Sequence, residues 1–255
     1  MVFIGGPCVI ENEKMLMATA EGLAEMCEEV GIGFVFKTSY DKANRTSGKS
    51  YRGPGLRAGL RMVSRVKRRL DVPILLDVHK ESECAPAAEV AEILQIPAFL
   101  CRQTDLIRAA AMTRRVVNIK KGQFLTPTDA QFAAEKVFAA GNTKVVITER
   151  GASFGYGNLV VDMRAIQIIR DFGIPAIFDA THSVQMPGAG GKTSGDRKFV
   201  PTLARAASAA GVDGIFMEVH PDPDTARSDA ANQMPLSQIR PLLKKLVEID
   251  RVVKK

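Results

Sequence analysis

Several basic residues lie at or just after short apolar runs that predict β-strands. Lys37, Lys120 and Arg150 close or follow such runs, and Lys42 and Arg45 lie in the loop after Lys37. Like charges in one pocket repel each other strongly unless anions compensate them. Arginine offers a bidentate fork and lysine a point charge for phosphate or carboxylate groups. The pattern therefore predicts a pocket for two small phosphate- or carboxylate-bearing substrates.

A thiol, an imidazole and two carboxylates at the same kind of position suggest metal ligation as a second chemistry. Cys8 follows the first apolar run, His182 follows the seventh, Glu218 lies in the eighth, and Asp229 comes farther along. Such a set suits a divalent transition metal such as Zn, Fe or Mn. Ligands from four separate segments have no regular spacing, so Cys8 as a small buried apolar residue stays open as the alternative.

Eight short apolar runs alternate with stretches of helical periodicity, and these elements must position the polar side chains. Continuous runs such as Ile74-Leu75-Leu76 are typical of parallel strands covered on both faces. The expected strands are 2–5, 33–37, 73–78, 93–97, 116–120, 144–149, 176–179 and 214–219. The expected helices are 15–30, 56–70, 104–112, 129–139, 162–172, 200–210 and 235–253.

Such regular alternation favours a single α/β domain, residues 1–255, folded as a (β/α)8 TIM barrel. A doubly wound open sheet is the rival fold, although it rarely uses eight even units. Sites in TIM barrels lie at the C-terminal ends of the strands. The Gly-rich segment 188–195, inside the seventh unit, is expected to be an active-site lid rather than a domain boundary. Other polar residues expected at this end are Asp77, His79, Gln95, Lys121, Glu149, Asp179 and His220.

Composition narrows the class of protein. The chain is 46% hydrophobic and 25% charged, which excludes a disordered chain. No apolar run approaches the roughly 20 residues of a membrane helix, and the first residues lack the pattern of a signal peptide. Four cysteines without a CxxC pair predict reduced thiols. We therefore expect a cytoplasmic protein with no membrane partner.

The net charge of +7 fits a nucleic-acid binder, a membrane-surface protein or an enzyme for anionic substrates. Clusters such as Lys67-Arg68-Arg69 and Lys244-Lys245 follow amphipathic helical patterns and predict ordinary helix surface. With three Tyr and no Trp, the stacking aromatics of a nucleic-acid module are lacking. Gly191-Lys192-Thr193 imitates the end of a P-loop, but Met186 stands where the motif needs its first glycine.

Long motifs in order along the whole chain resemble the 3-deoxy-D-manno-octulosonate 8-phosphate synthase family. Enzymes of this family condense phosphoenolpyruvate with arabinose 5-phosphate for lipopolysaccharide core synthesis. The motifs are Gly5-Gly6-Pro7-Cys8, Phe36-Lys37-Thr38-Ser39-Tyr40-Asp41-Lys42-Ala43-Asn44-Arg45-Thr46-Ser47, Gln95-Ile96-Pro97-Ala98-Phe99-Leu100-Cys101-Arg102-Gln103-Thr104-Asp105, Asn118-Ile119-Lys120-Lys121-Gly122-Gln123, Thr148-Glu149-Arg150-Gly151, Asp179-Ala180-Thr181-His182, Met217-Glu218-Val219-His220-Pro221 and Pro235-Leu236-Ser237-Gln238.

Two alternatives accompany this resemblance. The sister family, 3-deoxy-D-arabino-heptulosonate 7-phosphate synthase, uses erythrose 4-phosphate and has Lys-Pro-Arg-Thr-Ser where this chain has Lys42-Ala43-Asn44-Arg45-Thr46-Ser47. The extra residue and Asn44 match the longer, five-carbon aldose. A non-enzymatic barrel that binds polyanions at its basic mouth is the second alternative, and it would require salt-sensitive binding.

The resemblance also implies roles for individual residues. It assigns Lys120 and Arg150 to the phosphate of phosphoenolpyruvate, and Lys37, Ser39 and Lys42 to its carboxylate and reacting carbon. Asn44, Arg45 and Thr46 match the loop that binds the aldose phosphate, and Arg102 matches an arginine that reaches a neighbouring subunit, which implies a homotetramer. Cys8, His182, Glu218 and Asp229 match the ligands of the metal-dependent class, whose metal-independent counterpart has Asn at the Cys8 position. Lys42, His182 and Asp229 are the candidates for proton transfer.

Overall fold

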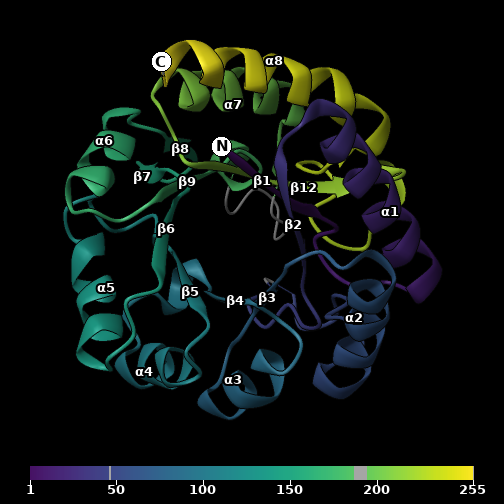
Figure 1. Ribbon diagram of the computed structural model, residues 1–255, viewed down its shortest axis with the longest axis horizontal. Helices are drawn as coiled ribbons and strands as arrows, with labels where there is room; N and C mark the ends of the chain where they lie inside the picture. Colours follow the sequence, from purple (N-terminus) through teal and green to yellow (C-terminus); the bar gives the residue numbers. More distant parts are fainter. Residues whose placement is uncertain (46, 187–193, 255) are drawn as a thin grey trace.

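The computed structural model describes residues 1–45, 47–186 and 194–254, in which eight parallel strands close into a barrel (Figure 1). β1 pairs with both β2 and β12, so the sheet has no open edge between its first and last strands, and the doubly wound alternative is wrong. The barrel strands are β1 (Val2–Gly6), β2 (Gly33–Thr38), β3 (Ile74–Asp77), β4 (Ile93–Ile96), β5 (Val116–Lys120), β6 (Val145–Glu149), β9 (Ala176–Asp179) and β12 (Gly214–His220).

Helices form the ring outside these strands (Figure 1). They are α1 (Glu13–Val30), α2 (Leu56–Leu70), α3 (Glu81–Ala88), α4 (Thr104–Met112), α5 (Ala130–Ala139), α6 (Arg164–Asp171), α7 (Val200–Ala209) and α8 (Ile239–Val253). The first begins at an N-cap, because the side-chain oxygen of Asn12 accepts a hydrogen bond from the Met15 amide, 2.9 Å away. The (β/α)8 prediction is confirmed.

The sequence-based expectation lacked one helix and several short elements. α3 was absent from it because its eight residues include Pro86 and lack an apolar stripe. The start of the expected last helix is instead a 3₁₀ turn, η6 (Leu236–Gln238). Short strands also occur in the loops: β7 (Ala152–Phe154) with β8 (Asn158–Val160), β10 (Gln185–Met186) with β11 (Ser194–Gly195), and β13 (Met234–Pro235) beside β12. Most of the predicted lid 188–195 lies outside the described residues.

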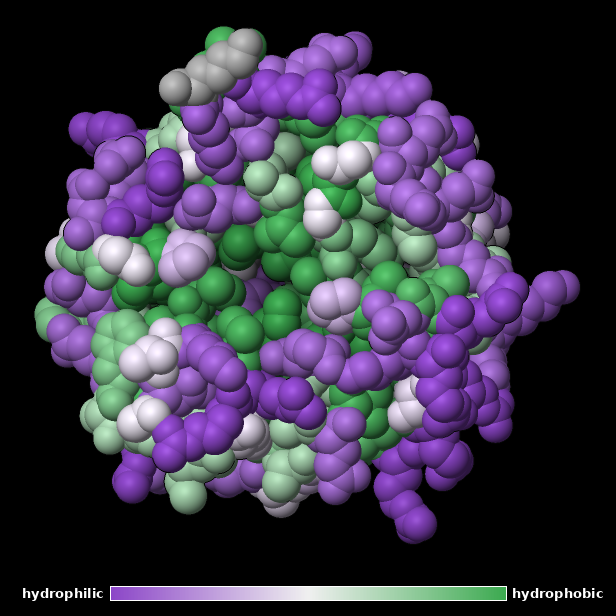
Figure 2. Space-filling view, in the orientation of Figure 1, coloured by the Kyte–Doolittle hydropathy of each residue, from purple (hydrophilic) through white to green (hydrophobic). Residues whose placement is uncertain are grey.

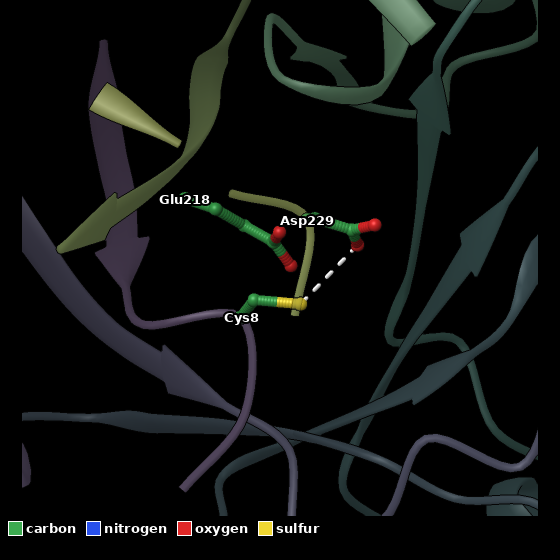
Figure 3. Close-up of side chains that lie close together, drawn as sticks. All are labelled: Cys8, Glu218 and Asp229. Atoms are coloured by element: carbon green, nitrogen blue, oxygen red, sulfur yellow. Dashed lines mark hydrogen bonds between the residues drawn. The ribbon is translucent and has the colours of Figure 1, made fainter. Parts of the chain in front are cut away.

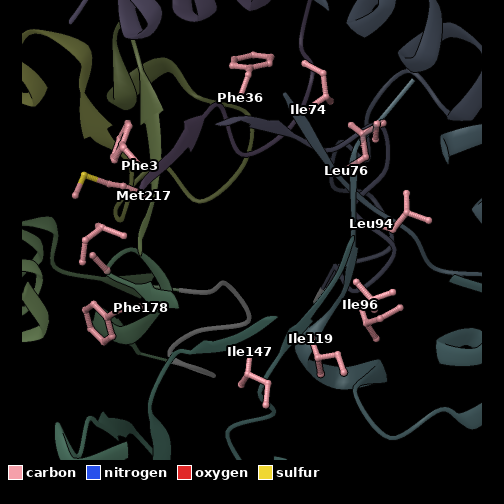
Figure 4. Packing of buried hydrophobic residues seen from close by; sticks show 14 of the residues in the cluster. Phe3, Phe36, Ile74, Leu76, Leu94, Ile96, Ile119, Ile147, Phe178 and Met217 are labelled. Atoms are coloured by element: carbon pink, nitrogen blue, oxygen red, sulfur yellow. The ribbon is translucent and has the colours of Figure 1, made fainter. Parts of the chain in front are cut away.

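Two apolar layers hold the barrel together. Strand residues that point outward pack against the helices, as Phe3, Leu94, Ile119 and Phe178 do in Figure 4. A smaller cluster fills the lower barrel interior and consists of Ile4, Val35, Leu75, Ile177 and Phe216. Figure 2 shows hydrophobic residues around the middle of the face in view and hydrophilic residues along its periphery.

In four of the strands, the inward-facing residue changes from apolar to charged two positions farther along the chain. Successive residues of a strand alternate between faces, so residues i and i+2 point the same way. Val35 is followed in this sense by Lys37, Leu75 by Asp77, Ile177 by Asp179 and Phe216 by Glu218. All four polar side chains are buried. An upper, charged interior layer therefore stands directly on a lower, apolar one.

Candidate active site

A cavity of about 760 Å³ lies at the C-terminal ends of the strands, above the charged layer. Eight of the predicted site residues line it: Lys37, Lys42, Asn44, Arg45, Lys120, Arg150, His182 and Asp229. Thr46, which the resemblance assigns to the aldose phosphate, lies outside the described residues. The predicted convergence of cations at one mouth is therefore present in the structure.

Carboxylates inside the barrel neutralise the lysines of this cavity. The Nζ of Lys37 lies 2.7 Å from Oε1 of Glu218, and the Nζ of Lys120 lies 2.7 Å from Oδ2 of Asp179. Lys42 lies 3.6 Å from Glu218 and 3.9 Å from Asp77. The expectation that bound substrates alone compensate the positive charges is incomplete, because the strand ends also carry these three acids.

The pKa values of the acids follow from this pairing. Burial by itself raises the pKa of Asp77, but Lys37 and Lys42 outweigh it and hold that pKa well below the usual range. The same balance of burial against nearby lysines lowers the pKa of Glu218. Both acids are thus carboxylates at neutral pH, and the charged layer consists of lysines paired with carboxylates.

Arg150 presents donors that the protein itself does not use. Its Nη2 donates to Oε1 of Gln185 at 2.7 Å, whereas its buried Nε and Nη1 have no hydrogen-bond partner among the described residues. The Nζ of Lys120 lies 4.1 Å from the centre of the Phe216 ring, which forms a floor below it. Buried donors without partners are costly, so this part of the cavity is suited to an anion such as phosphate.

A possible metal centre lies beside these cations. One ligand atom from each of Cys8, Glu218 and Asp229 lies within 4.8 Å of the others (Figure 3). The Sγ of Cys8 lies 2.9 Å from Oγ of Ser228 and 3.3 Å from Oδ2 of Asp229, within hydrogen-bonding distance of both. Oε2 of Glu218 is buried with no hydrogen-bond partner in the described chain. The donor set and this orphaned oxygen fit a divalent transition metal.

His182 lies next to these three residues rather than among them. Its Nε2 lies 3.8 Å from Oδ2 of Asp229 and 3.9 Å from Oε2 of Glu218. Its Nδ1 lies 2.8 Å from Oδ2 of Asp179, a contact that fixes the plane of the ring. Nε2 therefore remains on the side that faces the possible metal ligands.

The predicted aldose loop is joined to the loop that carries Asp229. Nη1 of Arg45 donates to Oγ of Ser228 at 2.8 Å, and its Nη2 donates to the carbonyl of Arg227 at 2.9 Å. The guanidinium of Arg227 stacks 3.5 Å from the centre of the Tyr51 ring. Sequence reasoning missed Ser228, Arg227 and Tyr51, since no local pattern links segments about 180 positions apart.

Four predicted residues do not line the described cavity: the possible metal ligands Cys8 and Glu218, and the predicted substrate-binding residues Ser39 and Arg102. Ser39 is buried, and its hydroxyl donates to the carboxylate of Asp77. Arg102 has an exposed side chain, and its carbonyl accepts a hydrogen bond from Lys136 at 2.8 Å. Ser39 therefore supports the charged layer through its hydrogen bond to Asp77, and Arg102 lies on the outer surface.

Comparison with known proteins agrees with this geometry. The model of the DAHP synthetase I family matches residues 1–255. The chain is 56% identical over its full length to a protein of Trichlorobacter lovleyi and 55% identical to one of Syntrophotalea carbinolica, covering 94% and 92% of those chains. A Magnetococcus marinus protein is 56% identical, with 89% of its length covered. All three are named 2-dehydro-3-deoxyphosphooctonate aldolase. The chain belongs to the DAHP synthetase I family, and the resemblance found in its sequence is confirmed.

Proposed function

We propose that the protein is a transferase that condenses phosphoenolpyruvate with D-arabinose 5-phosphate and water. The products are 3-deoxy-D-manno-octulosonate 8-phosphate and inorganic phosphate, and the octulosonate is a precursor of the lipopolysaccharide core. The observation that carries the proposal is the single cavity that is lined by Lys120 and Arg150 and also by a loop bearing Asn44 and Arg45. The names of the relatives support it independently.

The cations of the barrel interior suit phosphoenolpyruvate. Arg150 has free Nε and Nη1 donors within the described structure, and Lys120 lines the same cavity, so both serve the phosphate. Lys37 and Lys42 lie between Asp77 and Glu218 and serve the carboxylate and the reacting carbon. Ser39 acts through Asp77, to which its hydroxyl donates.

The loop over the cavity suits the phosphate of the aldose. Asn44 and Arg45 line the cavity. Arg45 donates a hydrogen bond to Ser228, the residue directly before Asp229. Two phosphates held at opposite ends set the C3 of phosphoenolpyruvate against the aldehyde carbon. Such positioning lowers a bimolecular barrier by about 7 kcal/mol or more in favourable cases.

The reaction then follows from the chemistry of the enol. C3 of phosphoenolpyruvate bonds to the aldehyde carbon, whose oxygen takes a proton, while positive charge develops at C2. Water adds at C2 and loses a proton, and the resulting hemiketal phosphate loses phosphate by cleavage of the C–O bond. Lys42, His182 and Asp229 line the cavity and are the candidates for carrying these protons. The contact with Asp179 holds the His182 ring in place for this task.

Cys8, Glu218, Asp229 and His182 would hold a divalent metal, with Fe, Zn and Mn as the ions that suit this donor set. When bound, such an ion polarises an oxygen of the aldehyde or of water. The Cys8 thiol is buried, and this burial raises its pKa. A bound cation reverses that effect because a metal-ligating thiol is deprotonated.

We also propose a homotetramer in which Arg102 reaches the cavity of a neighbouring subunit. Its exposed position away from its own cavity is consistent with this role. A cytoplasmic location fits the four free, buried cysteines of the described chain. Within residues 1–45, 47–186 and 194–254, no helix has the length and apolar character needed to cross a membrane.

One assay separates the proposal from its alternatives. Phosphate release from phosphoenolpyruvate is measured with arabinose 5-phosphate and, in parallel, with erythrose 4-phosphate. The proposal predicts the higher kcat/KM for arabinose 5-phosphate. Preference for erythrose 4-phosphate would assign the sister activity, 3-deoxy-D-arabino-heptulosonate 7-phosphate synthesis. No turnover with either aldose, together with salt-sensitive binding of a nucleic acid, would favour the non-enzymatic polyanion-binding barrel.

A further inference from the structure

A chain of side-chain hydrogen bonds crosses four neighbouring strands inside the barrel. Oγ1 of Thr148 in β6 donates to Oδ1 of Asn118 in β5 at 2.7 Å. Nδ2 of Asn118 donates to Oε1 of Gln95 in β4 at 2.9 Å, and Nε2 of Gln95 donates to Oδ1 of Asp77 in β3. The hydroxyl of Ser39 reaches the other oxygen of that carboxylate. We name this chain, Thr148–Asn118–Gln95–Asp77, the polar ladder.

Each step of the polar ladder dictates the orientation of the next. The oxygen of Asn118 accepts from Thr148, so its NH₂ group must face Gln95. The oxygen of Gln95 then accepts from Asn118, so its own NH₂ group must face Asp77. An ionised carboxylate only accepts, so it is the natural end of such a chain. All four residues are at most 5% exposed, and an error at any step would leave a buried polar atom unpaired.

The polar ladder connects buried residues to the cavity. Gln95 and Asp77 line the described part of the cavity wall, whereas Asn118 and Thr148 do not. Oδ2 of Asp77 lies 3.9 Å from the Nζ of Lys37 and 3.9 Å from that of Lys42. The carboxylate of Asp77 therefore holds both ammonium groups together with Glu218, which lies 2.7 Å from the Nζ of Lys37 and 3.6 Å from that of Lys42, and the polar ladder orients the Asp77 carboxylate.

We infer that Thr148 and Asn118 are positioning residues for phosphoenolpyruvate. They hold Gln95, and through it Asp77, in the one orientation that places Lys37 and Lys42 for the carboxylate and reacting carbon of the substrate. This inference rests on the proposed function. It assigns a task to residues that lie deeper in the barrel than the groups that contact substrate.

The test is Thr148→Val, which keeps the shape and β-branching of the side chain and removes only the donor. We expect kcat/KM for phosphoenolpyruvate to fall about tenfold, because the buried oxygen of Asn118 loses its partner. Thr148→Ser keeps the hydroxyl and should restore most of the activity. The matched control is Thr38→Val, because Thr38 is also a buried strand threonine but its hydroxyl has no partner among the described residues. That control should retain wild-type kinetics.

A double-mutant cycle separates positioning from a general structural effect. Asp77→Asn removes the end of the polar ladder, so Thr148→Val should cause little further loss in that background. Multiplication of the two separate losses would overturn the inference, and so would wild-type kinetics in a folded Thr148→Val protein. If Thr148→Val does not fold, Gln95→Met cuts the same ladder and carries the same prediction.

Calorimetric titration with phosphoenolpyruvate alone keeps the two proposals apart. The inference predicts about tenfold weaker binding by Thr148→Val than by Thr38→Val. If the wild-type protein bound phosphoenolpyruvate but released no phosphate with arabinose 5-phosphate, the proposed reaction would fail and the ladder would still be supported by that ratio. Equal affinities of the two variants would reject the ladder whatever the reaction.

Discussion

The lower and upper layers of the barrel interior lie only two residues apart along the same strands, yet their chemistry is opposite. The lower layer contains Ile4, Val35, Leu75, Ile177 and Phe216 and buries apolar surface, which stabilises the fold. The upper layer places Lys37, Lys120, Asp77, Asp179 and Glu218 out of water. Buried ion pairs seldom repay their desolvation.

This difference indicates that the two layers have different roles, the lower one in stability and the upper one in the candidate active site. A single pleat of the sheet separates the part that stabilises the barrel from the part that forms the candidate active site. Phe216 belongs to both, because its ring packs in the lower layer and lies 4.1 Å below the Nζ of Lys120. Substitutions in the upper layer should therefore change catalysis, and substitutions in the lower layer should change stability.

Arg150→Met gives the largest expected change in the comparison. The substitution removes two buried donors that have no partner among the described residues, and the one side-chain hydrogen bond lost is that to Gln185. We expect kcat/KM for phosphoenolpyruvate to fall by about a hundredfold or more, with a nearly unchanged free energy of unfolding. Steady-state kinetics and urea denaturation check the two parts. A large loss of stability with intact activity would contradict the division between layers.

Arg45→Ala is expected to have a smaller and more selective effect. Arg45 is only partly buried and is held by Ser228 and the carbonyl of Arg227. We expect the KM for arabinose 5-phosphate to rise about tenfold, while that for phosphoenolpyruvate changes much less. Varying each substrate at saturating levels of the other measures the split. An equal rise in both KM values would contradict the assignment of this loop to the aldose.

Leu75→Ala should have the smallest effect on activity, although it is the most destabilising of the three. Leu75 is fully buried in the lower layer, two residues before Asp77. Its truncation leaves a cavity and should lower the free energy of unfolding by about 3 kcal/mol. The KM values of the folded variant should stay near those of the wild type. A marked rise in either KM would mean that the lower layer also positions the substrates.

Much of this architecture could be predicted from sequence, since it depends on local patterns. The eight strands follow from short apolar runs, and the basic residues that end or follow those runs include Lys37, Lys120 and Arg150. Helix α3 could not be found this way, because Pro86 and the acidic first turn hide its periodicity.

Contacts between distant segments were beyond sequence reasoning. Asn118 and Thr148 lie inside recognisable motifs, but their pairing depends on the register of β5 against β6. The link from Arg45 to Ser228 joins two loops whose approach depends on closure of the barrel. Residue types at the strand ends suggested the set of possible metal ligands and the resemblance matched it, but only the three-dimensional arrangement places Cys8, Glu218 and Asp229 within 4.8 Å of one another.

The most direct test of the account is phosphate release from phosphoenolpyruvate and arabinose 5-phosphate before and after treatment with EDTA. The arrangement of Cys8, Glu218 and Asp229 predicts that chelation abolishes release and that added Mn²⁺, Zn²⁺ or Fe²⁺ restores it. Atomic absorption on the same samples should follow the activity. Undiminished phosphate release from protein shown to be free of metal would contradict the proposal that these residues hold a catalytic metal.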